Sequence, residues 1–528
     1  MNTVDRITAL ADPACYPHRP RDVRVLQTHL SIVCLAGDLV YKLKKAVTLP
    51  FVDFSALSAR QQACRDEVRL NRRLCPDVYL GTAPLHRDAA GALCFGATGS
   101  AASPDDVDAA VVMRRLPQAR MLDEQLRAGG VRPEAIAALA RHVADFHARC
   151  ERPDVATARA SAELLVRFAA ENFTEARALG DDALPTTLLA ALATASQAAF
   201  ARLLPALHAR AVAGRVVDGH GDLHARNVCM TEPPAVYDCI EFEPRFRVAD
   251  VAAEVAFLAM DLRYRGAPAL ARTFVDAYVA STGDRELPAL LPWLCSYRAM
   301  VRAKVAAIAA GEVELSTSDR DGARHSARAH LRLAAVYGVE TAAPLWLVLC
   351  GPPASGKSSI AAALHGAAGW PTLATDAVRK RLAGIAPHAR AGAACYTPDF
   401  SQRTYTTLLA DATAATASGA PVVVLDGNFP TPEHRAAAVA AAAAAGARVA
   451  LLHVAIDPAT ALARAQERAA RGDSVSDADA EVTARLGAAF VAPMPTEGLS
   501  GREIDGARAA AAAVDDVLAA LLALVARS

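Results

Sequence analysis

The residues best suited to chemistry lie in one short stretch, residues 220–227, with the sequence HGDLHARN. The spacing H-x-D-x-x-x-x-N places an Asp that can accept the proton of an attacking hydroxyl near an Asn that can bind magnesium. We therefore expect Asp222 to be the base, or the group that orients the acceptor, and Asn227 to be a metal ligand. His220 is expected to brace the loop, and Arg226 to neutralise charge on the transferred phosphoryl group.

Acidic residues follow this loop closely. A strand is predicted over residues 235–242, and it carries Asp238 and Glu241. One of them should bind the metal ion that bridges the phosphates, and the spacing leaves both open. Farther on, we expect Asp250 to brace the loop and Asp261 to be an ordinary helix residue.

Upstream, two strands joined by a tight turn at Gly37 are predicted over residues 30–45. Strand alternation places Lys42 and Lys44 on one face, where either could reach the phosphates of ATP. Glu67, in a helix predicted over residues 58–74, lies where it could pair with such a lysine. Lys42 and Glu67 are thus candidates for nucleotide binding.

Together these stretches resemble the aminoglycoside phosphotransferase and choline kinase superfamily over roughly the first 335 residues. The resemblance is carried by residues 40–45, 67–72, 220–224, Asn227, 237–242 and Asp250. It implies an α+β, bilobal, protein-kinase-like domain that phosphorylates hydroxyl groups of small molecules. The chain departs from the family in its nucleotide loop, where Gly37 stands alone and no glycine-rich signature occurs.

A second centre is residues 351–358, GPPASGKS, which follow the apolar run 345–350 and precede an alanine-rich helix. The pattern G-x-x-x-x-G-K-S in a strand–loop–helix setting predicts a phosphate-binding loop. Its backbone N–H groups wrap phosphate, Lys357 reaches the β- and γ-phosphates, and Ser358 holds magnesium. The residues expected to bind nucleotide are Gly351, Ala354, Ser355, Gly356, Lys357, Ser358 and Ser359.

Further polar residues follow the predicted strands of this half, and ligands of parallel sheets lie at the carboxyl ends of strands. Asp376, after the strand 371–374, is the candidate for orienting or deprotonating an acceptor hydroxyl. Asp426, after the strand 422–425, is the expected magnesium carboxylate. Arg464 and Arg468 suit a lid that closes on phosphates, although a solvated helix face explains them nearly as well.

This half resembles the P-loop kinases that include polynucleotide 5′-hydroxyl kinases, zeta-toxin-like kinases and gluconate kinases. Thr375-Asp376-x-x-Arg379, residues 426–429 and the helix with Arg464 and Arg468 carry the resemblance. It implies an α/β P-loop NTPase domain with a parallel sheet. The pairing of the two halves is similar to a bacterial family described as an aminoglycoside phosphotransferase-like protein fused to an ATP-binding domain.

Length and composition limit the remaining choices. A chain of 528 residues predicts two domains, at 1–340 and 345–528, with Gly338 capping the last helix of the first. Zero formal net charge gives no general reason to expect nucleic-acid or membrane binding. The 11 scattered cysteines and the lack of an apolar core in the first ten residues favour the cytoplasm.

The sequence thus predicts a bifunctional phosphotransferase that uses ATP and Mg²⁺ in each half, with a small hydroxyl-bearing metabolite as acceptor. Two alternatives stay open. One is a nucleotide-sensing regulatory ATPase whose kinase-like module binds a small molecule without phosphorylating it. The other makes the C-terminal half a polynucleotide 5′-hydroxyl kinase, the one case in which nucleic acid would be a partner. The sequence leaves the oligomeric state open.

Overall fold

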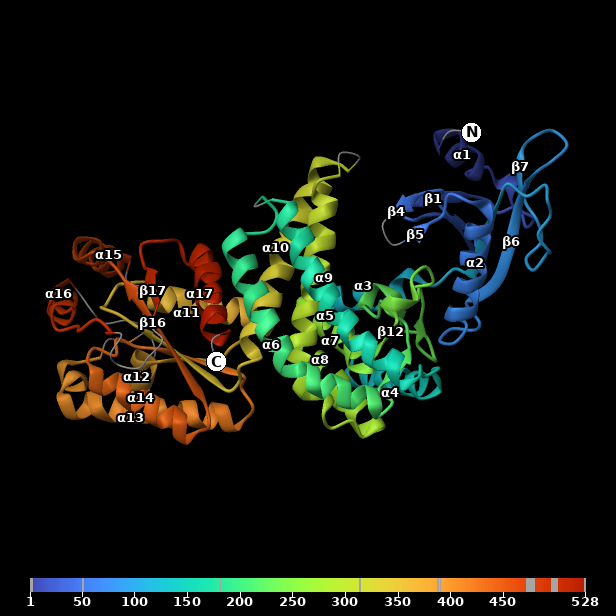
Figure 1. Cartoon of the computed structure of the whole chain (residues 1–528). Helices are drawn as coiled ribbons and strands as arrows, with labels where there is room; N and C mark the ends of the chain where they lie inside the picture. Colours follow the sequence, from blue (N-terminus) through green and yellow to red (C-terminus); the bar gives the residue numbers. More distant parts are fainter. Residues whose placement is uncertain are drawn as a thin grey trace. The chain divides into compact units, whose positions relative to one another are not determined.

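The computed structural model describes residues 3–49, 52–180, 182–312, 315–386, 389, 391–471, 480–494 and 502–526 (Figure 1). Contacts divide the chain into two compact units, each built from two segments. The first unit joins Met1–Arg167 to Leu203–Leu294, and the second joins Phe168–Arg202 to Cys295–Ser528. Three helices contribute residues to both units: α5 (Val155–Ala178), α6 (Thr186–Val212) and α9 (Leu287–Ala310). The domain limits expected at residues 340 and 345 stay a prediction.

The first unit begins with an antiparallel sheet in the order β1-β2-β3-β8-β6-β7. Its strands are β1 (Val23–Gln27), β2 (Ser31–Ala36), β3 (Leu39–Lys44), β6 (Tyr79–Arg87), β7 (Leu93–Phe95) and β8 (Asp108–Arg114). Helix α2 (Leu57–Asn71) packs on β8, β6 and β3. Helix α1 (Thr3–Leu10) and the hairpin of β4 (Thr48–Leu49) and β5 (Val52–Asp53) complete this small lobe.

Strand β3 gives the sheet two different faces. Tyr41 and Leu43 belong to the apolar cluster on one face, whereas Val40 belongs to the cluster that includes α2. Lys42 and Lys44 lie on the same side as Val40, as alternation along the strand predicts, and both contact α2. The apolar rows of β3 therefore hold the two lysines in place.

The turn beside the lysines is not the one at Gly37. Ser31 of β2 pairs with Lys44 of β3, and Ala36 pairs with Leu39. The β1–β2 turn at residues 28–30 therefore lies at the Lys44 end of the hairpin, and Gly37 lies at the opposite end. Gly37 therefore lies away from Lys44, and nucleotide binding at the turn of Gly37 stays a prediction.

The large lobe of the first unit consists of helices and short strand pairs. The helices are α3 (Leu122–Arg127), α4 (Pro133–Arg149), α7 (Val251–Tyr264) and α8 (Pro268–Thr282). The pairs are β9 (Val216–Asp218) with β12 (Val248–Asp250), and β10 (Val228–Cys229) with β11 (Ala235–Val236). The strand expected over 235–242 is limited to β11, and Asp238 has a left-handed backbone with φ +64°.

The second unit contains a parallel sheet in the order β14-β15-β13-β16-β17 (Figure 1). The strands are β13 (Leu345–Cys350), β14 (Thr372–Ala374), β15 (Val422–Asp426), β16 (Arg448–Ala455) and β17 (Arg502–Asp505). The helices that follow them are α11 (Lys357–Ala368), α12 (Thr375–Ala383), α13 (Pro398–Ala417), α14 (Pro432–Ala444), α15 (Pro458–Arg471), α16 (Ala480–Ala488) and α17 (Ala510–Val525). Every residue of β13 and β15 is buried, as their unbroken apolar runs predict. The expected fold class is confirmed.

Helix α10 (Thr317–Glu340) also packs within the second unit. It continues past Gly338, so the expectation that Gly338 caps a helix is wrong. A Cβ on Gly338 would lie 2.8 Å from Leu522 of α17 and 3.0 Å from Leu192 of α6. Gly338 is therefore a point of close helix contact rather than a helix end.

Helix α6 is long and apolar enough to cross a membrane, by length and composition alone. Near its end, however, Arg210 is 2% exposed and binds two buried carboxylates. Its guanidinium donates to both oxygens of Asp250 at 2.8 Å and to those of Asp284 at 2.7 and 2.8 Å. Asp250 also caps α7 by accepting from the Ala252 N–H at 2.8 Å. These bonds connect the end of α6 to the start of α7 and to the segment after α8.

Replacing Arg210 with alanine should lower the free energy of unfolding of the first unit by about 3–5 kcal/mol, because two buried carboxylates lose their partner. Urea unfolding followed by circular dichroism measures the change. The exposed Arg285 provides a matched control, and its alanine variant should change stability by less than about 0.5 kcal/mol. Equal effects of the two substitutions would contradict the assignment.

Candidate active sites

In the first unit, Glu67 of α2 is bound by both lysines of β3. Lys42 Nζ lies 2.9 Å from Glu67 Oε1, and Lys44 Nζ lies 2.5 Å from Oε2. The Glu67 side chain has no exposed surface, and Lys42 is 13% exposed. Burial alone would raise the pKa of Glu67, but the two ammonium groups hold it below its ordinary value. The lysine–glutamate pair considered from sequence is thus formed, with two lysines instead of one.

Asp238 and Glu241 contact different lysines. Lys42 Nζ is 2.5 Å from Asp238 Oδ1, whereas Lys44 binds Glu241. The Asp238 side chain is 43% exposed and that of Glu241 is 5% exposed. Desolvation opposes ionisation of Asp238, yet Lys42 keeps its pKa below the ordinary value, while burial raises the pKa of Glu241. Of the two candidate ligands, Asp238 is therefore the one able to offer an ionised, accessible carboxylate.

The loop at residues 220–227 brings Asp222 and Asn227 together. Asn227 Nδ2 donates to the Asp222 carbonyl at 3.0 Å and to its Oδ2 at 3.2 Å. His220 braces the loop from within, since its Nδ1 accepts from the Asp222 N–H at 3.2 Å and its Nε2 lies 2.9 Å from the Tyr237 carbonyl. Burial lowers the pKa of His220, which suits a neutral ring with one donor and one acceptor nitrogen.

Arg226 is the exposed residue of this loop. Its side chain is 65% exposed, and its Nε lies 3.7 Å from Asp123 Oδ2. A guanidinium at this exposure is held only weakly by one carboxylate. Its action on a phosphoryl group stays a prediction.

Two carboxylates farther along the chain make contacts that differ from those expected. Asp261, expected to be an ordinary helix residue, accepts from the Ala225 N–H of the catalytic loop at 2.8 Å. Asp250, expected to brace the loop, is instead the partner of Arg210. Both interpretations were wrong, because the sequence does not show which residues of α7 face the loop.

Three residues of the small lobe that had no predicted role hold the backbone at Asp238 and just before the loop 220–227. The Tyr79 hydroxyl accepts from the Asp238 N–H at 3.2 Å, and Asn71 Oδ1 accepts from the next N–H at 2.9 Å. Arg73 donates to two carbonyls just before the catalytic loop, each at 2.7 Å. The spacing of Asn71, one helical turn after Glu67, was the one usable signal.

In the second unit, the loop between β13 and α11 has the backbone of a phosphate-wrapping turn. Gly351, Ala354 and Gly356 have φ values of +151°, +63° and +101°. These values favour glycine, and Ala354 adopts its conformation at some cost. A Cβ on Gly351 would lie 2.5 Å from the Val454 carbonyl oxygen, so no larger residue fits there.

Lys357 closes this loop. It is 7% exposed and donates to the carbonyls of Gly351 at 3.0 Å and Pro352 at 2.8 Å, with Ser355 Oγ at 3.3 Å. These partners are neutral oxygens, which phosphate oxygens could replace as stronger acceptors. The lysine is thus already positioned at the start of α11.

Asp426 meets the loop at the carboxyl edge of the sheet, where it pairs in register with Leu349 of β13. Burial raises the pKa of Asp426, although Lys357 and a hydrogen bond from Ser358 oppose the shift. Ser358 and Ser359 are exposed. The structure therefore brings together Lys357, Ser358 and Asp426, as expected.

Asp376 lies in the first turn of α12 rather than at a strand end, because the helix begins directly at Thr375. One turn later, Arg379 is 8% exposed, and its Nε and Nη1 have no hydrogen-bond partner among the described residues. Its guanidinium stacks on Tyr396, 4.6 Å from the ring centroid. A buried cation whose donors are unsatisfied is a costly arrangement that an anionic ligand would relieve.

The guanidinium of Arg464 is hydrogen-bonded to the protein backbone. It donates to the carbonyls of Gly506 at 2.7 Å and Ala507 at 3.1 Å. The Gly506 carbonyl oxygen would lie 3.3 Å from a Cβ on Gly356, so this segment lies against the phosphate-binding loop. The side chain of Arg468 lies outside the described residues, and closure of either arginine on phosphates stays a prediction.

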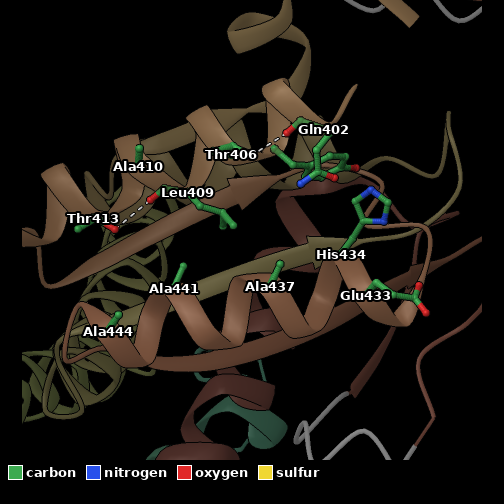
Figure 2. A pocket seen from close by; sticks show the side chains of 11 residues that line it. Gln402, Thr406, Leu409, Ala410, Thr413, Glu433, His434, Ala437, Ala441 and Ala444 are labelled. Atoms are coloured by element: carbon green, nitrogen blue, oxygen red, sulfur yellow. Dashed lines mark hydrogen bonds between the residues drawn. The ribbon is translucent and has the colours of Figure 1, made fainter. Parts of the chain in front are cut away.

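A groove of about 510 Å³ lies between α13 and α14 (Figure 2). It is lined by Gln402, Tyr405, Thr406, Leu409, Ala410, Thr413, Glu433, His434, Ala437, Ala441 and Ala444. The Tyr405 hydroxyl accepts from the Phe429 N–H at 3.1 Å, and its ring centroid is 4.5 Å from that of His434. The groove is mostly apolar, and none of the site residues predicted from sequence lines it.

Comparison with known families matches both halves. Residues 51–292 match the model of the phosphotransferase enzyme family, and residues 347–493 match that of an AAA domain. Uncharacterized proteins of Mycobacterium bovis and Mycobacterium tuberculosis are each 30% identical to the chain over 485 residues. Each alignment covers 90% of this chain and 92% of the relative.

Solved structures with similarity include an amicoumacin kinase in complex with AMP-PNP, Ca²⁺ and Ami, at 13% identity and a TM-score of 0.38, covering 65% of this chain and 94% of that one. A choline/ethanolamine kinase family protein from Mesorhizobium loti is 14% identical with a TM-score of 0.36, covering 62% and 98%. A gluconokinase from Sinorhizobium meliloti is 21% identical with a TM-score of 0.26, covering 34% and 94%.

Replacing Lys44 with methionine should destabilise the first unit by about 3–5 kcal/mol, because the buried Glu241 loses its partner. The loss should be larger at pH 8 than at pH 5.5. Without Lys44, burial raises the folded-state pKa of Glu241 further, so the folded state binds the extra proton and gains stability as pH falls. Thermal unfolding at both pH values measures this, and Arg69→Met, at an exposed arginine of α2, is the control. A loss that is independent of pH would contradict the role of Glu241.

Proposed function

This chain belongs to the family of the two mycobacterial proteins and is an ATP-dependent kinase that joins a phosphotransferase-family domain to an AAA domain, and we propose that each half transfers the γ-phosphoryl group of ATP to a hydroxyl group. One observation carries the proposal for the first half. Lys42 binds both Glu67 and Asp238, and the loop at residues 220–227 pairs Asp222 with Asn227. Phosphoryl transfer requires side chains of these types to be held in fixed positions.

In the first half, Lys42 orients the ATP phosphates and Glu67 orients Lys42. Asp222 holds the acceptor hydroxyl, whose oxygen forms the new bond to the γ-phosphorus as the bond to the β-γ bridging oxygen breaks. The hydroxyl proton passes to Asp222. Asp238 and the amide oxygen of Asn227 would be the oxygen ligands for Mg²⁺, which when bound would neutralise phosphate charge. Glu241 serves Lys44 instead of the metal.

In the second half, the backbone of residues 351–356 and the ammonium of Lys357 hold the ATP phosphates. Ser358 and Asp426 provide the oxygens suited to Mg²⁺. Asp376 holds the acceptor hydroxyl and takes its proton. Arg464 keeps the segment at Gly506 against the loop, and so shapes the nucleotide site from outside.

The acceptor of the second half is proposed to carry an anionic group. The supporting observation is Arg379, whose buried guanidinium leaves Nε and Nη1 without partners among the described residues. A carboxylate or phosphate matches the planar donors of arginine. A small anionic metabolite meets this requirement, and so does the phosphate of a polynucleotide end, which keeps the polynucleotide kinase as a second candidate for this half.

The cellular setting is proposed from the thiols. All 11 cysteines are free, and nine of them are buried. A chain with this many unpaired thiols suits a reducing compartment, so we place the enzyme in the cytoplasm, acting on soluble acceptors.

The division of labour can be tested on the full chain with γ-labelled ATP and separate panels of metabolites and oligonucleotides. Asp222→Asn should lower transfer by the first half about 10²- to 10⁴-fold while ATP binding stays unchanged, because the loop keeps its shape and loses its base. Lys357→Ala should abolish nucleotide binding by the second half and leave nucleotide binding by the first half unchanged. Asp276→Asn, at an exposed carboxylate of α8, is the control. Unchanged label transfer in both variants would show that Asp222 and Lys357 do not have these roles. Absence of label transfer by the wild-type chain to any acceptor of either panel would favour the nucleotide sensor.

The anion requirement predicts a specific effect of Arg379→Met. The variant keeps an apolar stem beside Tyr396 but has no donors, so the acceptor KM of the second half should rise at least about tenfold. ATP affinity should stay unchanged, and thermal stability should not fall, because the substitution removes two buried donor nitrogens that have no hydrogen-bond partner among the described residues. A thermal midpoint well below that of the wild type would show that Arg379 is a structural residue.

A further inference from the structure

The catalytic loop of the first unit is held from α7 by a carboxylate that the proposed chemistry does not use. Glu254 Oε1 accepts from the Gly221 N–H at 2.8 Å and also from the His220 N–H. These two N–H groups directly precede Asp222. Glu254 is 2% exposed, and in the described part of the chain no lysine or arginine is paired with it. Its charge is therefore stabilised by directed hydrogen bonds, which fix geometry as well as energy.

The glycine before the loop shows how closely this carboxylate approaches the backbone. A Cβ on Gly219 would lie 2.1 Å from Glu254 Oε1 and 2.7 Å from its carboxyl carbon. Any side chain at residue 219 would have to displace the carboxylate. The absence of a Cβ here is thus a requirement of the Glu254 contact and not of the local turn.

The second oxygen of Glu254 is also occupied. His147 Nε2, from α4, lies 2.9 Å from Glu254 Oε2, and His147 Nδ1 lies 2.8 Å from the Tyr278 hydroxyl of α8. With Tyr278 donating to Nδ1, the ring must carry its proton on Nε2 and donate it to Glu254. All three side chains are at most 3% exposed. The pair from α4 and α8 therefore backs the carboxylate on the side away from the loop.

A second carboxylate of α7 holds the other end of the loop. Asp261 Oδ2 accepts from the Ala225 N–H at 2.8 Å and from Arg265 Nε at 3.0 Å. Glu254 and Asp261 are seven residues apart, which is about two turns and so places them on one side of the helix. Between these two anchors lies Asp222.

We propose that Glu254 is a positioning residue that sets the backbone of the catalytic loop and thereby the place of Asp222, with His147 and Tyr278 keeping Glu254 in register. Asp261 supports the same loop from its other end. A charged acceptor holds two adjacent N–H groups more strongly than a neutral one, so the loop depends on the ionised carboxylate.

Hydrogen–deuterium exchange with fragmentation, on the full chain, tests the proposal without any acceptor. In Glu254→Gln, which keeps the shape, exchange at the amides of residues 220–221 should rise at least about tenfold. Tyr278→Phe should raise it less, since only the backing hydroxyl is lost. Asp276→Asn, an exposed carboxylate of α8, should leave it unchanged.

A kinetic measurement, which rests on the proposed function, separates positioning from folding. In a Lys357→Ala background, where nucleotide turnover belongs to the first half, Glu254→Gln should lower kcat for slow ATP hydrolysis at least about tenfold and change the ATP KM less than twofold. Absence of hydrolysis in the background itself would count against the proposed function but leave the exchange result decisive. Unchanged exchange at residues 220–221, or a rise throughout the large lobe, would overturn the proposal.

Discussion

Neutralisation of the buried carboxylate of Glu67 is the interaction on which the candidate active site of the first unit depends. Two ammonium groups approach its two oxygens, and each lysine then binds a further carboxylate from the segment after the catalytic loop. Removing charges from water is costly unless each one is paired, so the strand, the helix and the Asp238 segment cannot shift independently. The cost of separating these paired charges, and not any local turn, therefore fixes the positions of the side chains.

In the second half, the charged groups at the candidate site include two buried cations. Lys357 is held by carbonyl and hydroxyl oxygens, and the donors Nε and Nη1 of Arg379 lack partners among the described residues. A bound anion would there supply acceptors for the two donor nitrogens of Arg379. In the first half, Lys42 is instead paired with the carboxylates of Glu67 and Asp238. The two candidate sites therefore differ in the protein groups with which a bound phosphate would compete.

The features that sequence predicted are those encoded by spacing. The apolar run 345–350, the loop after it and the alternation that places Lys42 beside Lys44 are local patterns, and the structure has each of them. The errors at Gly338, Asp250 and Asp261 arise from partners far along the chain. The sequence suggests that Gly338 ends a helix, but in the structure Leu522 packs against it. The sequence also suggests that Asp261 is an ordinary helix residue, but its carboxylate accepts a hydrogen bond from the Ala225 N–H. No window of sequence contains both partners.

Glu254 belongs to the same class of long-range contacts, and it clarifies what the loop motif does. The motif supplies the reactive side chains, but its own N–H groups at residues 220, 221 and 225 are satisfied by carboxylates of α7. A loop that met those donors with its own side chains would have fewer of them left for catalysis. The reactive residues can be few and closely spaced because a helix outside the motif satisfies the backbone for them, and because two further helices keep that helix's carboxylate in place.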